Sequence, residues 1–410
     1  MERDVFENLS PLDHRYYASN EALFTELGAF FSENAYIRYE LKVEAALARV
    51  LARRGLCSEA VAAEIATACE EVTPEEVYRE EEITKHNIRA LVNCVQRRVS
   101  DAAKPFVHFT TTSVDIMDSA TALRFKDATT QVIVPRSLAL ERVLITIARR
   151  EKATLQVGRT HGQHAVPITF GFAMAEYVSR FGDRITAIQA AGSNLRGKIS
   201  GAVGAYNASS LFFQDPMGFE TEVLAELGLK PADYSSQIVA PEYLTDYIHT
   251  IISALGVLAN LADDIRNLQR TELGEVGETF EATQVGSSTM PHKRNPWNFE
   301  HVKSTWKEFM PRMITLYSDQ ISEHQRDLTN SASGRFVPEI VVGFAEAVQR
   351  LTRVLERLVV DEERMSHNFD LTKEMIIAEP LYILLASLGH PDAHEAVRRL
   401  TLESQKTGKS

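Results

Sequence analysis

Apolar residues recur at intervals of three and four over most of the chain, which is the spacing of one face of an α-helix. Two stripes are the clearest: one covers residues 248–268, and the other covers 344–358 with steps of 4, 3, 4 and 3. Shorter stripes predict helices within 21–98, at 134–153 and at 169–191. No alternating segments rich in Val and Ile compete with this pattern. The predicted fold class is therefore all-α.

The two clearest stripes predict a central bundle of long helices. Helices of this length with few capping residues need apolar partners on more than one side, so the pattern is compatible with a bundle shared between chains. We expect an elongated protein with three domains: an N-terminal helical domain at 1–105, a central long-helix bundle with a functional loop at 106–360, and a small C-terminal helical domain at 361–410.

Composition and charge exclude several classes of protein. The 410 residues include 56 acidic and 44 basic side chains, a net charge of -12, which argues against a general binder of nucleic acid or membrane surfaces but allows a local basic pocket for a small anion. Cys57, Cys69 and Cys94 are odd in number and lack CxxC spacing, so neither a disulfide framework nor a zinc site is expected. Without an apolar run long enough for a signal or membrane span, we expect a soluble cytoplasmic protein.

Polar breaks between the predicted helices carry residues that are typical of binding sites. They lie at Ser10–Tyr17, Lys85–Asn87, His108–Asp115, Gly158–Pro167 and Arg326–Arg335. Each also has a structural explanation as a turn, a helix cap or a solvated surface. The third break carries four consecutive hydroxyls, more than one helix cap needs, and a helix N-terminus offers free N–H groups to an anion.

The densest polar cluster is the stretch from Gly286 to Pro296. It places hydroxyls, an imidazole, a lysine and a carboxamide between a glycine and a proline. Such a composition is poorly suited to a hydrophobic core and well suited to holding an anion. We interpret the stretch as an active-site loop.

The same stretch resembles a known sequence pattern. Ser287-Ser288-Thr289-Met290-Pro291-His292-Lys293-Arg294-Asn295-Pro296 is similar to the GSSxMPxKxNP pattern of the fumarase/aspartase superfamily, and His292 with the downstream Glu300 resembles its adenylosuccinate lyase family. Further blocks match in the same order, from about residue 9 to 390: Ser10–Tyr16, Lys85–Asn87, Thr112–Asp115, Gly158–Gln163, Gly197–Gly204 and Arg326–Leu328. His14 and Asn87 replace the usual Gly and Asp, and the family's usual length implies that the domain at 361–410 is incomplete.

The resemblance implies β-elimination of fumarate from adenylosuccinate and from SAICAR in AMP biosynthesis. In the family the base is the first serine of the loop, here Ser287, and the acid is the histidine here at His161. Removing the carbon-bound proton builds negative charge that fixed donors must stabilise, and the departing amine needs a proton from a group that titrates near neutral pH. Lys293 and Asn295 match the need for fixed donors. The resemblance also implies that Glu300 pairs with a histidine or with Lys293, and that His86 lies nearby.

The resemblance also implies the substrate contacts. Guanidinium and hydroxyl groups suit a ribose phosphate, and those at matching positions are Arg15, Tyr16, Arg326, Ser331 and Arg335. Thr112 and Ser113 would hold a succinyl carboxylate. The remaining expected contacts are Lys85, Asn87, His108, Thr160, Gln237, Ser288 and His301. His108 has an equally well founded structural interpretation, as a partly buried histidine whose hydrogen-bonding groups are satisfied within the protein.

The implied assembly is a homotetramer around a central bundle, with each site built from three chains and with no metal or organic cofactor. Two alternatives stay open. One is another lyase of the superfamily or the related carboxymuconate cycloisomerase, which His292 and the blocks suited to phosphate disfavour. The other is a catalytically silent structural relative, against which Ser287, His161 and Lys293 argue.

Overall fold

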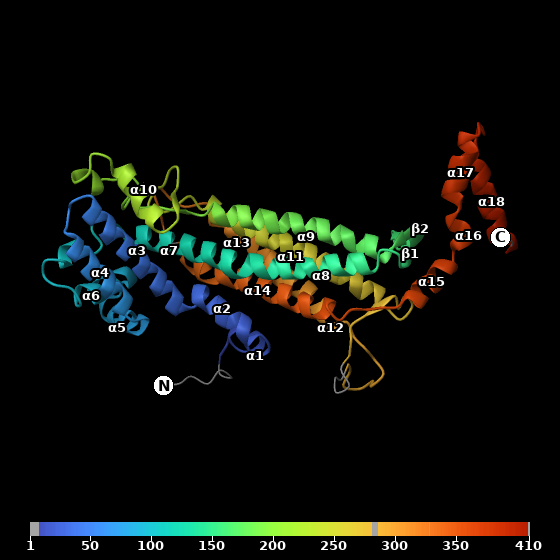
Figure 1. Cartoon of the computed structure of the whole chain (residues 1–410), viewed down its shortest axis with the longest axis horizontal. Helices are drawn as coiled ribbons and strands as arrows, with labels where there is room; N and C mark the ends of the chain where they lie inside the picture. Colours follow the sequence, from blue (N-terminus) through green and yellow to red (C-terminus); the bar gives the residue numbers. More distant parts are fainter. Residues whose placement is uncertain (1–7, 281–285, 328, 409–410) are drawn as a thin grey trace. The chain divides into compact units, whose positions relative to one another are not determined.

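The computed structural model describes residues 8–280, 286–327 and 329–408, and Figure 1 shows the course of the chain. Almost all of its regular structure is helical, and the strands are short. The all-α class predicted from the apolar periodicity is thus confirmed. The long periodic stripe at 248–268 lies in helix α11 (Glu242–Leu268), and the stripe at 344–358 lies in α14 (Ser331–Leu355) apart from its last positions.

The other elements follow in chain order. The remaining α-helices are α1 (Arg15–Ser19), α2 (Glu21–Phe31), α3 (Glu33–Arg53), α4 (Glu59–Glu71), α5 (Pro74–Thr84), α6 (Asn87–Gln96), α7 (Ser113–Ala128), α8 (Val134–Arg150), α9 (Phe170–Ser193), α10 (Pro216–Glu226), α12 (Trp297–Phe309), α13 (Met313–Ser318), α15 (Glu362–Asp370), α16 (Lys373–Ile376), α17 (Ala378–Ser387) and α18 (Ala393–Thr407). The strands are β1 (Leu155–Thr160), β2 (Gln163–Thr169), β3 (Arg196–Gly197), β4 (Lys230–Pro231), β5 (Val276–Gly277) and β6 (Val359–Val360).

The chain forms two compact units, and the first contains described residues 8–137, 184–255, 305–327 and 329–347. In it α3 packs against α4, α7 and α10, and α5 packs against α6. Helix α3 begins where the Ser32 hydroxyl accepts a hydrogen bond from the Ala35 N–H at 3.1 Å, and it ends two residues before Gly55, whose φ of 77° is the left-handed conformation that glycine favours after a helix. The buried face of α3 supplies Val43, Leu47 and Val50 to the core.

The second unit contains described residues 138–183, 256–280, 286–304 and 348–408. Strands β1 and β2 pair antiparallel, with Leu155 opposite Thr169 and Thr160 opposite Gln163. The break at Gly158–Pro167, which the sequence predicts as a turn between helices, is therefore a β-hairpin. Helix α15 contacts β1, α16 contacts β2, and α17 packs against α18.

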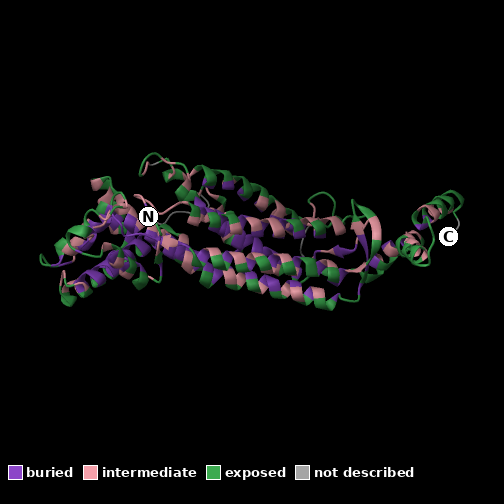
Figure 2. Ribbon diagram, turned by 90° about the horizontal axis from the view of Figure 1, so that it is seen from above, coloured by how far each residue is buried: buried purple, intermediate pink, exposed green. Residues whose placement is uncertain are grey.

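Residues of α8, α9, α11, α12 and α14 occur in both units. Figure 2 shows buried and exposed positions alternating along the helices, as one-sided packing requires. Among the described residues, α11 is the one helix long and apolar enough to cross a membrane by length and composition, but most of its apolar window is buried, which is typical of a core helix. The predicted division into three domains stays a prediction.

Candidate active site

The predicted site residues are shared between the two units. The first unit holds Arg15, Tyr16, Lys85, His86, Asn87, His108, Thr112, Ser113, Gln237, Arg326, Ser331 and Arg335. The second holds Thr160, His161, Ser287, Ser288, Lys293, Asn295, Glu300 and His301.

The loop from Gly286 to Pro296 is closed by its own hydrogen bonds. The Asn295 side-chain amide donates to the Gly286 carbonyl at 3.0 Å, and a side chain at Gly286 would collide with the Lys293 carbonyl, so glycine is required there. The backbone N–H groups of Thr289 and Met290 both donate to the Ser287 hydroxyl oxygen, at 3.3 and 3.1 Å. Two donors at this oxygen would stabilise negative charge on it, as a serine base needs.

The cations of this loop are accessible to a ligand. Lys293 is exposed, and its ammonium group forms no ion pair with any described residue. Glu300 is an exposed residue in the first turn of α12, and His301 follows it. Within the described part of the chain, the Glu300 carboxylate forms no ion pair with Lys293 or with a histidine. The predicted partner of Glu300 therefore stays a prediction.

His161 lies at the tip of the β1–β2 hairpin. His161 and Gly162 have φ values of 56° and 73°, which form the tight turn and leave Thr160 and His161 exposed. The hairpin is anchored by Glu275, which is fully buried and accepts hydrogen bonds from Gln156 at 2.8 Å and from Arg159.

The Asn368 amide also donates to Glu275, at 2.9 Å. Burial alone would raise the pKa of the Glu275 carboxyl, but its hydrogen bonds and the Arg159 charge lower it below the ordinary value. Glu275 thus anchors the hairpin that presents His161. This role could not be predicted from the sequence, because an isolated glutamate among glycines gives no signal of a contact with residue 156, more than a hundred positions earlier.

The N-terminus of α7 presents Thr112 and Ser113. The Asp115 carboxylate accepts a hydrogen bond from the Thr112 N–H at 2.8 Å, as in a capping box, and also from the N–H groups of Ser200 and Gly201, at 3.1 and 3.2 Å. The Lys198 ammonium forms an ion pair with Asp115, and both side chains are fully buried. This pair fixes the start of α7 against the segment after β3.

The Lys85–Asn87 block lies beside the same helix. His86 caps α6 by accepting a hydrogen bond from the Arg89 N–H at 3.3 Å through Nδ1, so the neutral ring carries its proton on Nε2. The Asn87 amide reaches the Met117 sulfur on α7 at 3.7 Å. The structure therefore places the block containing His86 and Asn87 near the helix that begins with Ser113. Lys85 precedes it in a left-handed conformation with φ 54°.

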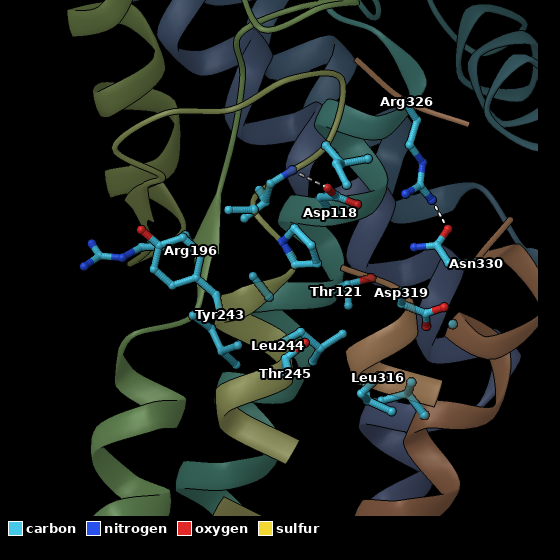
Figure 3. A pocket seen from close by; sticks show the side chains of 18 residues that line it. Asp118, Thr121, Arg196, Tyr243, Leu244, Thr245, Leu316, Asp319, Arg326 and Asn330 are labelled. Atoms are coloured by element: carbon cyan, nitrogen blue, oxygen red, sulfur yellow. Dashed lines mark hydrogen bonds between the residues drawn. The ribbon is translucent and has the colours of Figure 1, made fainter. Parts of the chain in front are cut away.

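A cavity of about 140 Å³ lies in the first unit between α7, the segment before α11, and the start of α14 (Figure 3). Polar residues facing it include Asp118, Arg326 and Asn330. Asp118 accepts a hydrogen bond from the Val239 N–H at 2.8 Å, and the Gln237 N–H donates to the Gln325 carbonyl at 3.3 Å. These bonds hold the segment that carries Gln237 between α7 and Arg326.

Asp118 is a candidate site residue that was not predicted from the sequence. Burial raises the pKa of its carboxyl to about 6, although the charges of Lys198 and Arg326 oppose this shift. One signal existed in the sequence: Asp118 follows Asp115 by three residues, so both lie on one side of α7. The Arg326 guanidinium donates to the Asn330 side chain, while its Nη1 is buried without a partner among the described residues.

Three of the predicted substrate contacts in the first unit are guanidinium groups that have no carboxylate partner among the described residues. Arg15, Arg326 and Arg335 form no ion pair with a described residue, whereas many other arginines of this acidic protein do. Ser331 and Arg335 are four residues apart on α14 and exposed, so they share one face of the helix. Guanidinium groups without internal partners are suited to an external anion.

No group of three or more His, Cys, Asp or Glu side chains that could hold a metal ion occurs in residues 8–280, 286–327 and 329–408.

Comparisons with known proteins agree with the fold and the motifs. A family described as Lyase matches residues 14–308, and the adenylosuccinate lyase C-terminal family matches residues 322–410. The adenylosuccinate lyase of Pyrococcus abyssi is 36% identical over 406 residues, which are 97% of this chain and 88% of that protein.

Two solved structures share the fold. The crystal structure of fumarate lyase from Mesorhizobium sp. BNC1 has a TM-score of 0.83 at 25% identity and covers 94% of this chain and 88% of its own. The 3-carboxy-cis,cis-muconate lactonizing enzyme of Pseudomonas putida has a TM-score of 0.80 at 27% identity and covers 92% and 85%.

The helical fold, the serine-containing loop and these matches define a lyase of the fumarase/aspartase superfamily. The matches over nearly the whole chain, including the C-terminal family, narrow this class further. The chain belongs to the adenylosuccinate lyase family.

Proposed function

We propose that the protein catalyses β-elimination of fumarate from adenylosuccinate, giving AMP, and from SAICAR, giving AICAR, in purine biosynthesis. The observation that carries this proposal is the set of guanidinium groups on Arg15, Arg326 and Arg335, which have no carboxylate partner among the described residues. A ribotide substrate brings a phosphate dianion that such groups bind, whereas argininosuccinate, malate and carboxymuconate have none. Tyr16 and Ser331 would add hydroxyl donors to the phosphate.

In the proposed reaction Ser287 Oγ removes the proton from the carbon beside a succinyl carboxylate. The electron pair left on carbon spreads into that carboxylate, where Lys293 and Asn295 stabilise the resulting aci-carboxylate. The carbon–nitrogen bond then breaks, its electron pair goes to nitrogen, and His161 donates a proton to the departing amine. Fumarate and the purine nucleotide then leave. Ser287 releases the proton that it has taken to solvent, and His161 takes up a proton from solvent, which restores the starting state.

The other predicted residues would bind and orient the substrate. Thr112 and Ser113, at the N-terminus of α7, would hold the second carboxylate where free N–H groups favour an anion. His86 and His108 would stabilise charge, and Glu300 would support the histidine or lysine that faces it. The further contacts are Lys85, Asn87, Thr160, Gln237, Ser288 and His301.

We further propose a cytoplasmic homotetramer in which each active site takes residues from three subunits, with no requirement for a metal or organic cofactor. Large exposed apolar side chains support an assembly of several subunits. Phe172 on the long helix α9, Phe336 on the long helix α14 and Ile314 on the short helix α13 are 67%, 58% and 69% exposed. The three-domain division at 105/106 and 360/361 belongs to the same proposal.

An ultraviolet assay of the purified protein with adenylosuccinate, SAICAR, argininosuccinate and malate in parallel tests the proposed function. We expect turnover of adenylosuccinate and SAICAR and none of the other two. Turnover of only argininosuccinate or malate would assign a different lyase activity, and no turnover of any substrate by the folded protein would indicate a catalytically silent relative.

A further inference from the structure

A fully buried carboxylate faces His108 from helix α3. Glu44 Oε1 lies 2.6 Å from His108 Nδ1, and Glu44 Oε2 accepts a hydrogen bond from the His108 backbone N–H at 3.1 Å. The Glu44 side chain is 0% exposed, whereas the His108 side chain is 20% exposed. One glutamate therefore binds both the ring and the backbone of a histidine that still reaches solvent.

The backbone around His108 has an unusual conformation. His108 and Thr110 have φ values of 60° and 64°, in the left-handed region that residues other than glycine seldom adopt. The Thr111 hydroxyl donates to the His108 carbonyl at 3.2 Å. Such conformations cost free energy and persist where surrounding contacts hold them. The two hydrogen bonds to Glu44 hold the ring in one orientation, just before the helix that presents Thr112 and Ser113.

The charges around His108 favour its protonated form. Glu44 on α3 and Asp115 on α7 are negative, and Arg89 on α6 is positive. Burial alone would lower the pKa of the His108 imidazole, but the charge and hydrogen bond of Glu44, together with Asp115, raise it above the ordinary value in spite of Arg89. Because Glu44 accepts the proton of Nδ1, the other ring nitrogen, Nε2, is the one available to a ligand.

We propose that Glu44 is a positioning residue for His108, holding the ring as an imidazolium whose Nε2–H donates to an anionic group of the substrate. This inference rests on the proposed function, and it chooses between the two interpretations of His108 that the sequence left open. The anionic group is a carboxylate of the succinyl arm, because Thr112 and Ser113, proposed to bind that arm, follow His108 by four and five residues. Glu44 lies 64 residues before His108 and acts only through it.

Two variants at Glu44 and one control test the proposal. Glu44→Gln keeps a hydrogen-bond acceptor but removes the charge, and Glu44→Asp keeps the charge on a shorter side chain. Glu40→Gln is the matched control, because Glu40 is equally buried one turn earlier on α3 and has no hydrogen bond with His108. Thermal unfolding of each variant shows whether it is folded. If Glu44→Gln is not folded, Glu44→Asp is measured in its place.

The first measurement is kcat/KM for adenylosuccinate as a function of pH. If the imidazolium is the active form, activity is lost as pH rises through the His108 pKa, and Glu44→Gln lowers that pKa. We therefore expect the alkaline limb to move to lower pH, with a loss of roughly 10- to 100-fold in kcat/KM near pH 8, because each unit by which the pKa falls lowers the protonated fraction about tenfold there. The loss should be smaller near pH 6, and Glu40→Gln should keep the wild-type profile.

A double variant separates a positioning role from a general loss of packing. If Glu44 acts through His108, Glu44→Gln combined with His108→Asn should be no less active than His108→Asn alone. Additive losses in the double variant, or a wild-type pH profile in folded Glu44→Gln, would overturn the proposal.

The second measurement does not depend on the reaction. Proteins with carbon-13-labelled histidine, compared with His108→Asn to assign the signal, give the titration midpoint of His108 by NMR. We expect Glu44→Gln to lower this midpoint and Glu40→Gln to leave it unchanged. If the wild type turns over none of the ribotides, the proposed function fails, and an unchanged midpoint in Glu44→Gln separately rejects the control of His108 by Glu44.

Discussion

At the scale of single residues, two buried glutamates on α3 show how surroundings decide the state of a carboxyl group. Glu44 has the His108 ring and backbone as partners, whereas burial raises the pKa of Glu40 to about 8 despite the nearby Arg124 guanidinium. A carboxyl group without sufficient compensation is protonated rather than charged in a protein interior.

The Glu40 pKa predicts a stability that falls with rising pH. The folded state keeps a proton on Glu40 between about pH 4.5 and about pH 8, whereas the unfolded state releases it, so this contribution to the free energy of unfolding decreases over that interval. Glu40→Gln should remove this dependence and stabilise the protein by about 2–4 kcal/mol at alkaline pH. Urea unfolding of both proteins at about pH 5 and about pH 9 measures the difference. An equal effect of the substitution at both pH values would contradict the assignment.

The proposed base and acid give a second prediction. Ser287→Ala and His161→Gln should each lower turnover of adenylosuccinate by roughly 10² to 10⁴-fold, because each removes one proton transfer. Neither side chain is buried, so both variants should unfold at the wild-type temperature. Near wild-type turnover in either variant would reject the role of that residue. Thr289→Ala, which removes an exposed hydroxyl of the same loop that is not among the proposed substrate contacts, is a control for the loop.

At the scale of elements, α14 contrasts two glycines. A Cβ atom at Gly343 would collide with the ring of Phe309, so glycine there permits close packing, whereas a Cβ at Gly334 meets nothing within 4 Å. Gly343→Ala should lower the free energy of unfolding by about 1–3 kcal/mol through overpacking. Gly334→Ala should raise it by roughly 0.5–1 kcal/mol, since alanine favours a helix. Chemical denaturation measures both, and a Gly343→Ala variant as stable as the wild type would disprove the close contact.

The elements also show which parts of the structure can be predicted from sequence. Helices such as α11 were predictable because one buried face imposes a local period of 3.6 residues. The β1–β2 hairpin was not, because its short strands follow no clear alternation and pair around His161 and Gly162. Motifs located the loop at Ser287, but Glu44 and Asp118 act through partners 64 and 121 residues away, which no local pattern reveals.

At the scale of the whole molecule, the proposed catalytic residues occur in blocks spread over much of the chain. Ser287 and His161 both belong to the second unit, yet no hydrogen bond joins them among the described residues. In the proposed tetramer they meet from different subunits. A symmetric assembly of this kind brings different segments of identical chains into every site.

Mixed tetramers of two inactive variants test this arrangement. If Ser287 and His161 of one site come from different subunits, co-expression of Ser287→Ala with His161→Gln produces some sites with both wild-type residues, and random mixing gives about a quarter of wild-type activity. Co-expression of Ser287→Ala with the double variant Ser287→Ala/His161→Gln contains no wild-type serine and should stay at background. If one subunit supplied both residues, each site of the first mixture would lack one of them. Activity at background in tetramers verified to contain both variants would then place Ser287 and His161 in the same subunit.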